Sequence, residues 1–510
     1  MLEPLSKRSV LLIAQRPSDY VEMRRCAVAL HEIGWTSLLL YFAQGNQNTE
    51  EQEIFREVIE LQRKGIVSKF EFLNFVPAAR LQGSLRKKGT LRQRVRNTAT
   101  ATRMIEAAKP LFKRYDNFLK RSRVIGGIYQ VLHLVRVAVR IVALYLRDER
   151  KLHRMVASLR PDAIVLPEDV VGLITPLVIK AGHRCNIPSV ILPYTIANQQ
   201  EAFLSLQHNP SYHYSHWANR AVGRMFPRWR MTQGNLTLVR LPAPYILGHQ
   251  LTLTSPPNPW MMNSGFANAI AVENDAMLDY YLGSGLPRSK MHVLGAIYDD
   301  YLANFKLNKA VELTALRAEL GIAGMLPLFV VGGCPDQSTS CPAGFEFKDI
   351  ADFTRQLADA LQPLKERYEI LMRPHPNFMQ MADVMAAHGI RTTTIDTARL
   401  VALSDIYLAF GSATIRWAIS CGVPALNYDV FHYDYDDYKK VGGVVHVETL
   451  DQLRKTFSEL LSNPPLVSRL QDEIAVSSKR WGNLDGKSTQ RIAGLIDGLC
   501  RLDRVPRTSH

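Results

Sequence analysis

The chain has 510 residues, 47% hydrophobic and 21% charged, which excludes a largely disordered protein and predicts two large domains rather than one core. Its formal net charge is +15. The segment from Arg80 to Arg160 contains 21 Lys or Arg and 4 Asp or Glu, so the rest of the chain is about neutral. Such a local excess predicts a polyanionic partner, either nucleic acid or an anionic membrane.

The first elements alternate between strand and helix. Ser9–Ala14 and Thr36–Phe42 are predicted strands, with a helix over Tyr20–Ile33 between them, and this alternation is typical of a parallel sheet. The apolar stretch Val10–Ala14 is too short for a signal-peptide core. Six scattered cysteines form no CxxC pair and no zinc pattern, so we expect free thiols in the cytoplasm.

A basic helical insertion is expected at about 80–155. Within it, 124–146 is almost long enough to span a membrane, but Arg136 and Arg140 near its centre make spanning costly. On a helix, one face holds Tyr129, His133, Arg136, Arg140 and Arg147, while Val131, Leu134, Val135, Val142 and Leu146 lie mostly elsewhere.

Two interpretations of that helix stay open. It can lie in a membrane interface, or it can pack its apolar face on the core and leave its arginines in water. The basic clusters at 86–88, 92–96 and 120–123 favour an anionic membrane, so we expect peripheral association with the inner membrane. Nucleic acid is the weaker partner, because no recognised module with interleaved aromatics is present.

The alternation resumes with a strand at 162–166, a helix at 175–185 and a strand at 187–194, and further strands are predicted at 269–272 and 291–294. The stretch 200–265 has no assignable pattern. Glu168 and Asp169 directly follow the first of these strands. They are candidate general bases, and the alternative is that they only cap the next helix.

A second α/β unit starts near Leu326. Its predicted strands are 326–331, 369–372, 392–395, 405–409 and 424–428, and its predicted helices lie within 347–368 and at 400–404, 413–421 and 490–502. In a parallel sheet, ligands bind beyond the carboxyl ends of the strands. The loops after three of these strands are therefore candidate parts of a binding site.

These loops carry residues suited to phosphate. Gly332 and Gly333 allow close backbone approach, and Arg373 and His375 stand in a loop stiffened by two prolines and followed by Asn377. The third loop holds Gly411, Ser412 and Thr414 at the expected start of a helix, where backbone amides and hydroxyls can bind an anion.

The run 403–412, together with Ala418 and Gly422-Val423-Pro424-Ala425, resembles the nucleotide-binding domain of GT-B glycosyltransferases over roughly 325–460. The His375-Pro376 pair and the later Ser412/Thr414 pair are similar to the HP and S-S/T motifs of bacterial sialyltransferases and Kdo transferases. That resemblance implies that His375, Ser412 and Thr414 bind a cytidine nucleotide and its phosphate. CDP-glycerol glycerophosphotransferases have similar features.

Two departures qualify the resemblance. Many transferases of uridine or guanosine nucleotides carry a ribose-binding Glu one turn past the small-residue loop, whereas 415–418 here contain no acid. This favours a CMP-activated sugar and argues against UDP-N-acetylglucosamine epimerases. Glu168-Asp169 is similar to the acidic motif of sialyltransferases, although its Gly172 comes two residues late. The acidic aromatic stretch 428–438 is expected to be a loop at the site, without an assigned role.

The sequence therefore predicts an α/β protein of the GT-B type, with two Rossmann-like domains facing a central cleft. Expected limits are 1–310 for the acceptor side, 311–485 for the nucleotide-sugar side and 486–510 for a final helix and tail. The expected activity is metal-independent, cofactor-free, inverting transfer from a CMP-activated acidic sugar to a surface polysaccharide or lipid-linked primer. Alternatives are a CDP-glycerol-type phosphotransferase, a UDP-sugar transferase or epimerase-like enzyme, and a non-catalytic scaffold.

Overall fold

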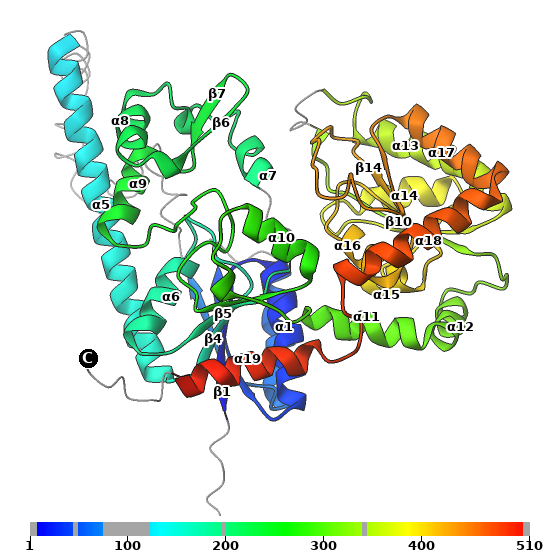
Figure 1. Cartoon of the computed structure of the whole chain (residues 1–510), viewed down its shortest axis with the longest axis horizontal. Coiled ribbons are helices and arrows are strands. Elements are labelled where there is room, and N and C mark those ends of the chain that lie inside the picture. The colour runs from blue at the N-terminus through cyan, green and yellow to red at the C-terminus, as the bar shows by residue number, and fades with distance from the viewer. Residues whose placement is uncertain (1–7, 44–48, 75–122, 195–198, 339–343, 503–510) are drawn as a thin grey trace, which may run out of the picture. The chain divides into compact units, whose positions relative to one another are not determined.

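A computed structural model describes residues 8–43, 49–74, 123–194, 199–338 and 344–502 (Figure 1). The basic clusters at 86–88, 92–96 and 120–122, and Cys341, lie outside these residues. The chain divides into two compact units. Unit 1 comprises 1–191, 197–269 and 498–510, and unit 2 comprises 192–196 and 270–497. The five cysteines in the described part are free thiols.

The first sheet has seven strands in the order β3-β2-β1-β4-β5-β8-β9. The strands are β1 (Ser9–Ala14), β2 (Thr36–Ala43), β3 (Val67–Asn74), β4 (Ala163–Leu166), β5 (Ser189–Ile191), β8 (Ala269–Val272) and β9 (Met291–Val293). β1 pairs in parallel with both β2 and β4. Because β1 and β4 are neighbours, the residues after Ala14 and after Leu166 lie at the same edge of the sheet.

The helices of unit 1 include α1 (Pro17–Glu32), α2 (Thr49–Arg63), α6 (Thr175–Arg184) and α5 (Arg123–Leu159). α1 starts three residues before the predicted Tyr20, because Pro17 fits the first helical turn and the Asp19 carboxylate accepts the backbone N–H groups of Gln15 and Arg16 at 3.1 Å. α5 has 37 residues and extends well past the predicted end at Leu146. Among the described helices, none is long and apolar enough to cross a membrane.

The stretch without a sequence assignment folds into short elements. They are α7 (Gln199–Leu204), α8 (Trp217–Met225), the antiparallel pair β6 (Arg230–Gln233) and β7 (Leu236–Val239), and α9 (Ala243–Leu251). Phe203, Leu238 and Trp260 form a small core of their own. α9 also packs on α5, where Gly248 lets Ile141 approach its backbone closely.

The second sheet has six parallel strands in the order β12-β11-β10-β13-β14-β15. They are β10 (Leu328–Gly332), β11 (Glu369–Arg373), β12 (Arg391–Thr392), β13 (Ile406–Ala409), β14 (Ala425–Tyr428) and β15 (Val444–Val447). β12 is shorter than the predicted strand at 392–395. β10 lies between β11 and β13, so the loops after these three strands are neighbours.

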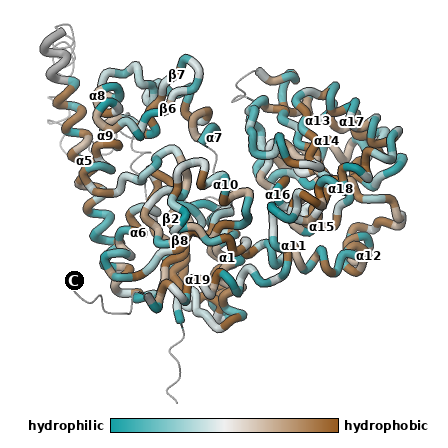
Figure 2. Tube along the Cα trace, viewed as in Figure 1, coloured by the Kyte–Doolittle hydropathy of each residue, from teal (hydrophilic) through white to brown (hydrophobic). Residues whose placement is uncertain are grey.

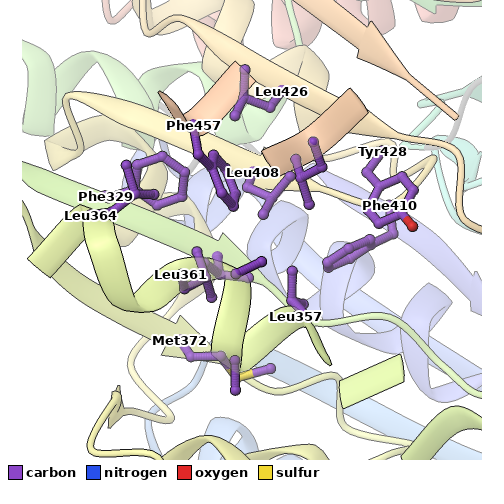
Figure 3. Close-up of a cluster of buried hydrophobic side chains, with 14 of the residues drawn as sticks. Phe329, Leu357, Leu361, Leu364, Met372, Leu408, Phe410, Leu426, Tyr428 and Phe457 are labelled. Carbon is purple, nitrogen blue, oxygen red and sulfur yellow. The ribbon is translucent and has the colours of Figure 1, made fainter. Parts of the chain in front are cut away.

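Helices cover both faces of this sheet. One core packs α13 (Ile350–Leu361), α14 (Gln380–Ala387) and α17 (Leu450–Ser462) on the strands, and Figure 3 shows its central side chains, among them Phe329, Leu361 and Phe457. The other core holds α11 (Ile297–Leu307), α12 (Lys309–Glu319), α15 (Thr397–Leu403), α16 (Ile415–Cys421) and α18 (Pro464–Trp481). The remaining helices are α10 (Asp275–Gly283) and α19 (Ser488–Leu502).

Candidate functional site

In unit 2, the loops after β10, β11 and β13 meet at the carboxyl edge of the sheet. The backbone N–H of Gly333 donates to the carbonyl of Arg373 at 2.7 Å. A Cβ added to Gly333 would come within 2.6 Å of the His375 amide nitrogen and 3.0 Å of the Arg373 carbonyl. Only glycine permits this approach, so the first loop directly fixes the backbone of the second.

His375 is half-buried, and its ring orientation is fixed by the backbone. Nδ1 accepts the N–H of Asn377 at 3.1 Å. Burial, and then the charge of Arg373, lower the pKa of His375, so the ring is neutral at neutral pH. With Nδ1 acting as an acceptor, the neutral ring carries its proton on Nε2. The loop therefore offers one neutral N–H donor of defined tautomer.

Arg373 has spare hydrogen-bonding capacity. One terminal nitrogen donates to the Pro374 carbonyl at 2.8 Å, while the buried Nε–H makes no hydrogen bond within the described residues. Burial lowers the pKa of Arg373, opposed by the nearby Asp396 carboxylate. Asn377 is exposed, and its backbone N–H is what fixes His375. The Arg373 guanidinium thus retains donors for an anion.

The third loop is held by a hydroxyl chain. Tyr407 Oη lies 2.7 Å from Thr414 Oγ1, which lies 2.9 Å from Ser412 Oγ. A side chain at Gly332 would overlap the Tyr407 hydroxyl, so this glycine makes room for the chain. Gly411 donates its N–H to Asn427 Oδ1 at 3.0 Å. α16 begins at Ile415, two residues later than predicted, so Ser412 and Thr414 stand in the turn before it.

The helix after this loop, α16, is anchored by its own buried residue Arg416. Its guanidinium is fully buried, pairs with Glu273 at 2.5 Å, donates to the Tyr194 carbonyl at 2.9 Å and lies 5.0 Å from the Tyr298 ring centroid. Burial raises the pKa of Asp299 nearby to about 7. The charged residue one turn past the loop is therefore a cation directed into the core of unit 2.

The acidic pair of unit 1 is buried at the end of β4. Glu168 forms an ion pair with Arg16 at 2.5 Å, and Arg16 also donates to Asp19 at 2.9 Å. Burial raises the pKa of Glu168, opposed by the Arg16 charge. Arg16 follows β1, which is the neighbour of β4, so the two residues come together although they are far apart in the sequence.

Asp169 is held through its backbone. Its N–H donates to Asn263 Oδ1, and its carbonyl accepts the N–H of Asn263, both at 2.8 Å. Its carboxyl group packs directly on Gly265, where a Cβ would overlap it. α6 begins only at Thr175 and has no side-chain cap, so neither acid caps that helix.

Several of these contacts were missed from sequence. The sequence patterns identify neither Arg16 nor Asp19 as a site residue, although their position just after an apolar strand was an available signal. The sequence predicts Tyr407 only as part of a strand, and in 415–418 it shows only that no acid is present, without indicating the role of Arg416. Asn263 falls in the stretch for which no pattern could be assigned.

Two parallel sheets with these helical layers form a GT-B-like fold with two Rossmann-like domains. The UDP-GlcNAc 2-epimerase of Neisseria meningitidis, solved with UDP-GlcNAc, matches with a TM-score of 0.50 and 13% identity over 96% of this chain and 100% of that one. At this identity the likeness supports the fold alone.

Two further structures match more weakly. The S. aureus MnaA–UDP co-structure has a TM-score of 0.47 and 11% identity, covering 97% of each chain. A Rickettsia africae glycosyltransferase has a TM-score of 0.44 and 12% identity, covering 97% of this chain and 99% of that one. No protein-family model and no curated protein sequence matches the chain.

Proposed function

We propose that this protein is a glycosyltransferase that uses a nucleotide-activated sugar bound by unit 2. The observation that carries the proposal is that three loops meet at one sheet edge and that two of them carry hydrogen-bond donors suited to a phosphate. His375 offers an Nε2–H, Arg373 offers a guanidinium with spare donors, and Ser412 and Thr414 offer hydroxyls. Donors of these kinds suit a phosphate that gains charge as the sugar departs.

The donor we favour is a CMP-activated acidic sugar such as Kdo or a sialic-acid-like nonulosonate. Uridine nucleotides would be supported by an acid one turn past the Ser412 loop. Here Arg416 lies in that turn and forms a buried ion pair with Glu273. No carboxylate is thereby presented to a ribose from this turn.

The reaction we propose is inverting and uses no metal. His375 and Arg373 stabilise the departing nucleotide phosphate, an effect that matters most in the transition state. Glu168 or Asp169 in unit 1 takes the proton from the acceptor hydroxyl, which is a poor nucleophile at neutral pH. We favour Glu168, because burial raises its pKa toward the working range while Arg16 holds its orientation.

The acceptor we expect is a surface polysaccharide or its lipid-linked primer. A UDP-sugar transferase or epimerase-like reaction is one alternative, and the Neisseria UDP-GlcNAc 2-epimerase is a protein of similar fold. CDP-glycerol-type phosphotransfer and a non-catalytic scaffold are the remaining alternatives.

A thermal-shift and turnover panel tests these options. The protein is melted with CMP, CDP, UDP and UDP-GlcNAc, and then incubated with CMP-Kdo, CMP-sialic acid and CDP-glycerol while nucleotide release is followed. We expect stabilisation by CMP and CMP release from one CMP-sugar when acceptor is present. Stabilisation by UDP with interconversion of UDP-GlcNAc would replace our proposal with the epimerase. No stabilisation by any nucleotide would favour the scaffold.

A further inference from the structure

α5 turns one side toward unit 1 and leaves the other side exposed. One helix face is buried, and its residues are spaced by three, four or seven positions: Ala138, Ile141, Tyr145, Leu152 and Val156. Tyr145 Oη also lies 3.2 Å from Nε2 of the buried His249 on α9. α6 and α9 both pack on α5, which runs along the flank of unit 1 in Figure 1. This packing accounts for one face of α5 and leaves the remaining faces exposed.

The exposed side carries an apolar stripe. Leu132, Val135, Val139 and Leu146 are 63%, 51%, 62% and 38% exposed, and their spacing of three, four and seven places them in one line along the helix. This line is distinct from the buried face. In Figure 2, the coloured part of α5 carries both hydrophobic and hydrophilic residues. Several large aliphatic side chains in one row are unusual on a surface facing water.

A basic stripe runs beside the apolar one. Arg136, Arg140 and Arg147 are exposed, and each follows a member of the apolar stripe by one position. Arg136 and Arg140 make no ion pair among the described residues, whereas Arg147 pairs only with its neighbour Asp148 at 2.8 Å. The sequence from Gln130 to Arg147 contains no acidic residue. The exposed side is therefore both apolar and cationic.

We propose that this exposed side of α5 docks flat on an anionic lipid leaflet. The apolar stripe enters the headgroup and acyl boundary, and the long arginine side chains reach the lipid phosphates beside it. Nucleic acid would satisfy the arginines but would leave the apolar stripe in water. A second copy of the helix on the same face would bring two rows of arginines together. The two alternatives for this helix are thus reconciled, because one side packs on the core and another binds lipid.

Vesicle flotation of the full chain tests the proposal. Vesicles contain phosphatidylcholine alone, or phosphatidylcholine mixed with phosphatidylglycerol. Variant A replaces Leu132, Val135 and Val139 with Gln, and variant B replaces Arg136, Arg140 and Arg147 with Gln. We expect the wild type to float only with anionic vesicles. Each lost arginine should weaken binding about fivefold, so variant B should bind roughly 100-fold more weakly. Variant A should lose at least as much.

Matched controls lie on unit 2. Exposed apolar residues Val311, Met325 and Val476 are changed together to Gln, and so are exposed basic residues Arg454, Lys455 and Arg469. Both controls should float as the wild type does, and all variants should keep the wild-type melting temperature. If either triple lowers it, Leu132→Gln and Arg140→Gln alone replace the triples.

Two results would overturn the proposal. The first is a wild type that fails to float with either vesicle. The second is flotation of both α5 variants at wild-type strength. If flotation then disappears when Arg86, Lys87, Lys88, Arg92, Arg94 and Arg96 become Gln, the preceding segment carries the binding instead. Loss of binding in both α5 variants, with both controls unaffected, supports docking through this helix.

Discussion

Two buried carboxyl groups in unit 2, those of Glu273 and Asp299, lie beside a single buried guanidinium, that of Arg416. Glu273 forms the ion pair at 2.5 Å. Asp299 accepts the N–H of Ala296 at 2.8 Å, and burial raises its pKa from 3.8 to about 7. Replacing Asp299 with Asn imitates the protonated acid and removes the titration. We therefore predict that Asp299→Asn changes how the stability of the protein depends on pH.

The sign and size follow from linkage. Because the folded-state pKa of Asp299 is raised, its contribution to stability is complete below the unfolded value of 3.8 and is lost as the pH rises through about 7. Each pKa unit corresponds to about 1.4 kcal/mol, and about two units of the shift fall between pH 5 and pH 8, giving a loss of roughly 2–3 kcal/mol. A domain of this size loses about 2–4 °C of melting temperature per kcal/mol, so the expected drop is roughly 5–10 °C.

The assay is a thermal melt of the wild type and Asp299→Asn at pH 5, 6, 7 and 8. Titrating groups distant from Asp299 affect both proteins equally, so the difference between the two profiles reports on Asp299 and its neighbour Glu273. The opposite trend of His249, whose pKa is lowered to about 4 by burial, cancels in this difference. We expect the melting temperature of the wild type to fall by roughly 5–10 °C relative to that of Asp299→Asn between pH 5 and pH 8. Parallel profiles over this range would refute the assignment of a protonated Asp299.

Three further predictions concern the proposed chemistry. His375→Ala should lower kcat by about 100-fold or more with the nucleotide still bound, and a wild-type kcat with every competent donor would exclude its role. Glu168→Gln should fold and bind nucleotide normally but lose about 100-fold in kcat. Arg16→Met should move the acidic limb of the pH profile of kcat/KM to higher pH, because removing the positive charge raises the pKa of Glu168. An unchanged limb would show that Glu168 is not the base. Gly333→Ala should weaken nucleotide binding and stability together, whereas Gly324→Ala, where a Cβ meets nothing, should leave both near wild type.

Local pattern was sufficient for much of the fold. β1 and β8 have the predicted limits, and β10, β11, β13 and β14 lie within two residues of them, because short apolar runs ending at Gly, Pro or polar residues mark strands clearly. α5 was predicted as a helix but extends to Leu159, because its later turns bury Leu152 and Val156 on the core. The domain limits at 310 and 485 and the roles of the site residues stay predictions.

The sequence by itself determined which residues stand at the ends of strands, and hence that Gly333, His375 and Ser412 were candidates. These residues lie close together because β10 pairs with both β11 and β13, and only long-range strand pairing decides that order. The same holds for Arg16 beside Glu168 and for Arg416 beside Glu273, since each pair joins distant parts of the chain. The periodicity of a sequence predicts on which face of an element a side chain lies. A buried charge also needs a partner that offsets the cost of its burial, and that partner comes from a distant part of the chain, so only the tertiary structure decides it.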